Sequence, residues 1–118
     1  IVLAGFLWLV PEEILDHFPG RVVNIHPALL PDYGGKGMYG SRVHRAVIAN
    51  REKESGITIH YVNSKYDEGD IIFQARCEVK PDDSPESLAE RIHALEHKYY
   101  PLIIDKLIRE AEDVEAQE

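Results

Sequence analysis

The sequence lacks a second cysteine, a cluster of basic residues and a long hydrophobic segment. With Cys77 as its only cysteine, the chain forms no intrachain disulfide, which is typical of proteins in a reducing compartment. The longest nearly continuous apolar run, residues 1–10, is about half as long as a membrane span. No basic segment precedes that run, as a signal peptide would require. We therefore expect a cytoplasmic protein with no membrane partner.

The charge of the chain is acidic and unevenly placed. Thirteen basic and 21 acidic residues give a net charge of −8. The last ten residues, 109–118, hold five acids and one base, so they carry half of the excess. Nucleic acid requires clustered Lys and Arg residues, which this sequence does not have. We expect small-molecule ligands, no nucleic-acid partner, and a solvated acidic tail over residues 109–118.

The length and composition predict one globular domain. The chain has 118 residues, 44% of them hydrophobic and 29% charged, which are ordinary values for a folded domain. It has no initiator methionine and starts inside the apolar run at Ile1. We expect it to be the C-terminal part of a longer protein, with residues 1–108 forming the folded portion.

Hydrophobic periodicity and turn residues predict alternating strands and helices, followed by a hairpin and a long helix. The second strand of the hairpin follows a short polar turn. The alternation of side chains along the first hairpin strand predicts that one of its faces is buried more deeply than the other. Ser84 is expected to cap the last helix and Pro101 to kink it. The expected elements are a strand over 1–6, a helix over 11–18, a strand over 21–25, a helix over 41–50, hairpin strands over 57–62 and 70–79, and a helix from residue 85.

This order of elements predicts an α/β fold with parallel strands. Ligands of such sheets bind beyond the carboxyl ends of the strands. Asn24 and His26 stand at one such end.

Asn24 and His26 form the first candidate site, together with Asp67 in the turn of the hairpin. Residues i and i+2 of a strand share a face, so the two side chains are expected to point into one cleft. An amide donates to a developing oxyanion, an imidazole transfers protons near neutral pH, and a carboxylate raises the pKa of a histidine. The alternative is a polar pair at a strand end and an unrelated turn aspartate.

A second pattern is His93-Ala94-Leu95-Glu96-His97, which matches the H-x-x-E-H signature of some zinc proteases. Residues 93 and 97 share a helix face, but a catalytic zinc needs a third ligand, and no downstream motif supplies one. A partly buried polar helix face is the alternative that we favour.

Four blocks of the chain, in the expected order, resemble the folate-dependent formyltransferases. They are Leu3–Phe6, Val23-Asn24-Ile25-His26-Pro27-Ala28-Leu29-Leu30-Pro31, Gly56–Val62 and Tyr66–Ile72. The resemblance covers about residues 1–108 and implies the C-terminal part of a Rossmann-like formyltransferase fold, with parallel strands, a β-hairpin and a long C-terminal helix. The block Glu96–Pro101 is most similar to the members that formylate glycinamide ribonucleotide in purine biosynthesis.

The resemblance implies a role for each matching residue. Asn24 would bind the formyl oxygen, His26 would donate a proton, Asp67 would tune His26 and assist proton transfer, and Thr58 would support the site. The formyl donor would be 10-formyltetrahydrofolate, and no metal is expected. The implied folate-binding residues are Asn24, Leu7, Trp8, Leu9, Val10, Asn63, Ser64, Lys65, Tyr66 and Asp67, and the implied ribonucleotide-binding residues are His93, Ala94, Leu95 and Glu96.

The chain departs from the family pattern in two ways. Ala28 stands where the family has serine, and the glycine-rich phosphate loop of the family belongs to an N-terminal half that is not in this sequence. Other interpretations are a formyltetrahydrofolate hydrolase, a methionyl-tRNA formyltransferase or a non-catalytic remnant. We also expect the 118-residue chain alone to self-associate and to show little transferase activity.

Overall fold

The computed structural model describes residues 2–4, 22–30, 32–35, 38, 41–62 and 70–117, with side chains for those from 22 to 111. Two helices and four strands lie in these ranges. They are β1 (Val2–Ala4), β2 (Val23–His26), α2 (Ser41–Ala49), β3 (Glu54–Tyr61), β4 (Ile71–Glu78) and α3 (Pro85–Gln117). The helix expected over 11–18 lies outside the described residues.

The four strands form one mixed sheet in the order β1-β2-β3-β4. β1 and β2 are parallel, whereas β3 is antiparallel to both β2 and β4. The predicted α/β class, the parallel first pair and the hairpin are therefore confirmed. β1 is an edge strand of the described sheet.

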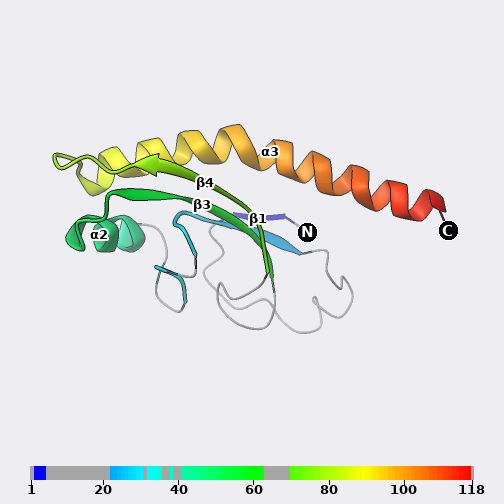
Figure 1. The fold of residues 1–118 in the computed structure, drawn as a ribbon, viewed down its shortest axis with the longest axis horizontal. Coiled ribbons are helices and arrows are strands. Elements are labelled where there is room, and N and C mark those ends of the chain that lie inside the picture. Colours follow the sequence, from blue (N-terminus) through cyan, green and yellow to red (C-terminus); the bar gives the residue numbers. More distant parts are fainter. Residues whose placement is uncertain are drawn as a thin grey trace.

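The sheet has one apolar face, which packs against α3. Ile25 of β2 and Ile57 and Ile59 of β3 form a buried cluster with Leu88 and Ile92 of α3. Figure 1 shows the first part of α3 running along the sheet and its C-terminal part extending beyond the strands, with α2 at the end where α3 begins. Because α3 takes the apolar face, the side chains at the alternate positions of β2 and β3 point to the other face.

β3 is buried on both faces, which the predicted one-sided alternation did not anticipate. Every residue from Ser55 to His60 is buried. The loop after β2 explains the difference, because Ala28 and Leu30 bond to the Thr58 side chain on the polar face. A polar face covered by a loop is as inaccessible as an apolar face covered by a helix.

The last helix begins as the sequence predicts. The Ser84 hydroxyl accepts a hydrogen bond from the Ser87 amide at 3.1 Å, which caps the helix, and Pro85 occupies the first helical position. Pro101 lies inside α3, which continues without interruption to Gln117, and the kink expected there stays a prediction.

The expected acidic tail is not a separate segment in its backbone, because residues 109–117 continue α3. Glutamate, alanine and glutamine are good helix formers, which explains this continuation despite the high charge. Neither described helix is long and apolar enough to cross a membrane.

Candidate active site

A row of polar side chains crosses the sheet on the face opposite α3. Asn24 pairs with His60 in the register of β2 and β3, and His26 pairs with Thr58. Directly opposite residues of an antiparallel pair project to the same face, so these four side chains form one polar row. All four are buried. The predicted sharing of a face by Asn24 and His26 therefore agrees with their places in β2.

The amide of Asn24 is oriented by His60. Its Nδ2 lies 3.4 Å from Nε2 of His60, and Nδ1 of His60 lies 3.0 Å from the carbonyl oxygen of Tyr61. A carbonyl oxygen only accepts, so Nδ1 carries the proton of the neutral ring and Nε2 accepts from Asn24. One amide N–H of Asn24 is thus engaged, while its Oδ1 has no hydrogen-bond partner within the described part of the chain.

The imidazole of His26 is oriented by a backbone carbonyl. Its Nε2 lies 2.7 Å from the carbonyl oxygen of Tyr33, seven residues further along the chain. By the same reasoning Nε2–H donates to this carbonyl. This hydrogen bond fixes the orientation of the His26 ring.

Thr58 fastens the loop after His26 to the sheet. Its hydroxyl donates to the Ala28 carbonyl at 2.7 Å and accepts from the Leu30 amide at 3.0 Å. Gln74 of β4 donates to the same hydroxyl at 3.0 Å and to the Leu30 carbonyl at 2.9 Å. The backbone that follows His26 is consequently held by three hydrogen bonds to side chains of β3 and β4, and a fourth bond joins those two side chains.

A third histidine, His44 of α2, lies near this row. Burial lowers the pKa of His44, and the nearby imidazoles of His93 and His26 lower it further. Its Nδ1 has no hydrogen-bond partner among the described residues. His44 is therefore neutral near pH 7. Its interactions with His26 and His93 also place α2 near the end of β2 and near the ribonucleotide-binding stretch expected on α3.

That stretch, His93–Glu96, lies in the first half of α3. His93 and Ala94 are exposed, whereas Leu95 and Glu96 are partly buried. Burial raises the pKa of Glu96 above its ordinary value, while His93 and His97 act in the opposite direction. A bound cationic amine would stabilise the charged form of such a carboxylate, because it replaces the favourable interactions with water that are lost on burial.

Several predicted site residues lie outside the described residues. They are Asp67 and the remaining folate-binding residues Leu7, Trp8, Leu9, Val10, Asn63, Ser64, Lys65 and Tyr66. Their roles stay predictions.

The sequence analysis missed His60, Gln74 and Tyr33. His60 had a detectable signal, because it stands two residues after Thr58 on the same face of a strand. Gln74 and Tyr33 gave no local signal, since their roles depend on strand register and on a loop conformation.

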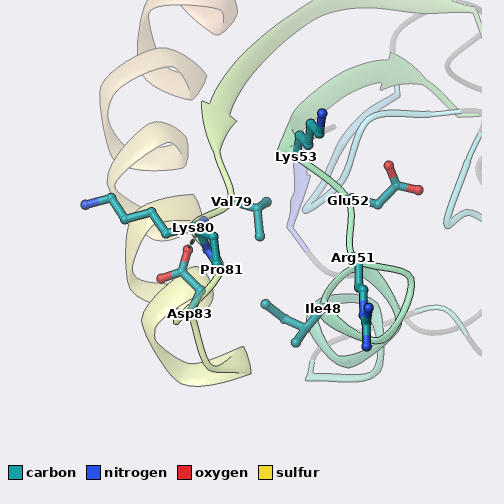
Figure 2. Close-up of a pocket in the computed structure, with 8 residues that line it drawn as sticks. All are labelled: Ile48, Arg51, Glu52, Lys53, Val79, Lys80, Pro81 and Asp83. Atoms are coloured by element: carbon teal, nitrogen blue, oxygen red, sulfur yellow. Dashed lines mark hydrogen bonds between the residues drawn. The ribbon is translucent and has the colours of Figure 1, made fainter.

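A pocket between the end of α2 and the β4–α3 connection lies apart from the polar row. Its lining includes Ile48, Val79 and Pro81 and the charged residues Arg51, Glu52, Lys53, Lys80 and Asp83. Figure 2 shows the side chains of Arg51, Lys53 and Lys80 pointing in different directions rather than toward one point. The pocket therefore does not form a converging anion site.

The H-x-x-E-H pattern gains no support from the geometry. Within the described ranges, no group of three or more His, Cys, Asp and Glu side chains is placed to hold a metal ion.

Comparison with known proteins gives consistent matches to one family. The family described as formyl transferase matches residues 1–104. The chain is 47% identical over 110 residues to the chloroplastic phosphoribosylglycinamide formyltransferase of Arabidopsis thaliana, covering 93% of this chain and 38% of that protein. It is 40% identical over 108 residues to phosphoribosylglycinamide formyltransferase of Bacillus subtilis, covering 92% of this chain and 53% of that protein.

The solved structures give the same result. The crystal structure of phosphoribosylglycinamide formyltransferase from Bacillus halodurans superposes with a TM-score of 0.83 and 38% identity, covering 93% of this chain and 54% of that one. The chain thus spans about half the length, or less, of the relatives named here. Since the family match extends over residues 1–104 of 118, the chain belongs to the formyl transferase family.

Proposed function

We propose that this chain carries the catalytic groups for transfer of a formyl group from 10-formyltetrahydrofolate to the amine of glycinamide ribonucleotide. The observation that carries the proposal is the placement of Asn24 and His26 side by side on the buried polar face at the end of β2. The relatives named phosphoribosylglycinamide formyltransferase support the choice of substrate.

The proposed reaction begins with attack of the substrate amine on the formyl carbon. The carbonyl oxygen becomes an oxyanion, which the second N–H of the Asn24 amide and the protonated ring of His26 stabilise. The bond from carbon to the folate nitrogen then breaks, the substrate nitrogen loses a proton and the folate nitrogen gains one. We assign Asp67 to this proton transfer, as the family resemblance implies.

His60 has a supporting role in this proposal. By accepting from one amide N–H, it fixes the Asn24 side chain so that the other N–H keeps a constant direction. A donor held in place before reaction loses little free energy to reorganisation as charge develops.

The test is turnover of the complete gene product that contains this sequence, with His26→Ala as the variant. We expect kcat to fall by about 10²–10⁴-fold, the range for a positioned acid–base group, and folate binding to change far less. Isothermal titration calorimetry with the folate reports binding independently of turnover.

His97→Ala is the matched control, because it removes an exposed imidazole of α3 outside the polar row. A small effect of this variant also separates formyl transfer from the zinc interpretation, which requires His97. Consumption of formyltetrahydrofolate without added ribonucleotide would identify a hydrolase, and turnover of His26→Ala within a few-fold of wild type would refute the assignment of His26.

For the 118-residue chain alone, we propose self-association and little activity. Ile71, Leu102 and Ile108 are 49%, 62% and 52% exposed, and such apolar side chains favour association. Sedimentation velocity measures the size of the particle, and a compact, fully active monomer would contradict this proposal. We also propose that the protein acts in the cytoplasm, although the Arabidopsis relative is named as chloroplastic.

A further inference from the structure

The carbonyl that holds His26 belongs to a residue with an unusual backbone. Tyr33 has a φ of 57°, in the left-handed region that non-glycine residues seldom adopt. This conformation places its carbonyl oxygen 2.7 Å from Nε2 of His26. An uncommon backbone state persists only where surrounding contacts impose it, so something must hold Tyr33 in place.

The phenol of Tyr33 supplies such contacts. It donates a hydrogen bond to Oε1 of Glu52 at 2.8 Å and accepts one from Nδ2 of Asn50 at 3.0 Å. Burial raises the pKa of Tyr33, with Glu52 adding to the effect, so the phenol remains a donor throughout the neutral range. We call Tyr33, Asn50 and Glu52 the tyrosine clamp.

The end of α2 brings the two partners of Tyr33 together. Arg51 has a φ of 53°, its amide bonds to the Ile48 carbonyl at 3.0 Å, and the Glu52 amide bonds to the Val47 carbonyl at 3.3 Å. These two bonds form a Schellman motif, in which the chain reverses direction after the helix. Asn50 and Glu52 flank the left-handed residue, and this turn directs both side chains to one phenol.

We propose that Tyr33 is a positioning residue for His26, whose imidazole the tyrosine clamp holds through the Tyr33 carbonyl. The inference rests on the proposed formyl transfer for its catalytic meaning. The side chain of Tyr33 does not touch the reacting atoms in this scheme. It fixes the carbonyl, and the carbonyl fixes the orientation of the His26 ring through Nε2–H.

The first experiment measures the exchange of the Nε2 proton of His26 with water by NMR of nitrogen-labelled protein. The variants are Tyr33→Phe, which removes the hydroxyl, and Glu52→Ala, which removes its acceptor from an exposed position. We expect exchange to be at least about tenfold faster in each, because losing the clamp bonds frees the loop. The double variant should be no faster than the single ones.

Glu54→Ala is the matched control. It removes a carboxylate two residues away, whose exposed ion pair with Arg76 joins β3 and β4 and does not reach Tyr33. Exchange in this control should equal that of wild type. If Tyr33→Phe and Glu52→Ala also leave exchange unchanged while remaining folded, the inference is overturned.

The second experiment measures turnover of the same variants in the complete gene product. We expect kcat to fall about five- to tenfold, with KM for both substrates within about twofold, because the clamp aligns His26 rather than binding substrate. A variant that raises KM and leaves kcat unchanged would overturn the positioning role. If wild type transfers no formyl group but the exchange results hold, the proposed function fails and the clamp on His26 stands.

Discussion

Replacing Thr58 with valine tests how firmly the loop after His26 is fastened to the sheet. Thr58 is completely buried, and its hydroxyl bonds to the Ala28 carbonyl, the Leu30 amide and the Gln74 amide. Valine has nearly the same shape but no hydroxyl. The substitution therefore removes three hydrogen bonds without opening a cavity.

The expected loss of stability follows from the groups left behind. The Leu30 amide and the Ala28 carbonyl each lose a partner, at about 1–3 kcal/mol per buried group. The methyl that replaces the hydroxyl returns about 0.8 kcal/mol through burial. Gln74 retains its bond to the Leu30 carbonyl, so it adds little to the loss. The net destabilisation is about 1–5 kcal/mol.

Urea unfolding followed by far-ultraviolet circular dichroism measures this loss, at one protein concentration for all variants because association would shift the midpoint. Thr58→Ser is the matched control, since it keeps the hydroxyl and loses one buried methyl, at about 1 kcal/mol. We expect the order wild type, Thr58→Ser, Thr58→Val from most to least stable. A Thr58→Val protein as stable as Thr58→Ser would refute the argument that this hydroxyl anchors the loop.

Three further substitutions test other parts of the fold. Gly56→Ala would put a Cβ 1.9 Å from the Ala75 carbonyl oxygen, so we expect the free energy of unfolding to fall by about 3 kcal/mol in the same urea assay. A urea midpoint equal to that of wild type would contradict the close approach of β3 and β4 at this residue. Arg51→Gly relieves a positive φ of 53° and should raise stability by about 0.5–1 kcal/mol; a fall would show that the arginine side chain matters more than the backbone. The Arg91 guanidinium holds the pKa of Asp83 well below its usual range, so the pair stabilises the fold above the unfolded pKa of about 3.9 and loses this effect as the pH falls below it. Asp83→Asn should therefore destabilise the protein at pH 7 and differ progressively less from wild type in acid, whereas a pH-independent difference would contradict the ion pair.

The sequence alone determined the α/β class and the order of those elements that the structure describes. Short apolar runs, the serine and proline at residues 84 and 85, and the polar turn between the hairpin strands are local signals, and each led to an element that the structure contains. The sequence also predicted that Asn24 and His26 share a face of the sheet, because residues two positions apart in a strand point to the same side. High charge near the C-terminus predicted a solvated acidic tail, but it did not indicate that helix-forming residues continue α3 to Gln117.

Only the tertiary structure decided what surrounds His26. Its ring donates a hydrogen bond to the carbonyl of Tyr33, a residue with a positive φ. A tyrosine in the sequence does not predict such a backbone conformation, as a glycine would. Asn24 and His60 are 36 positions apart in the chain, and their pairing depends on the register between β2 and β3, which periodicity does not specify. Local patterns set which residues share a face, whereas register and loop geometry set which of them meet, because those contacts join segments far apart in the chain.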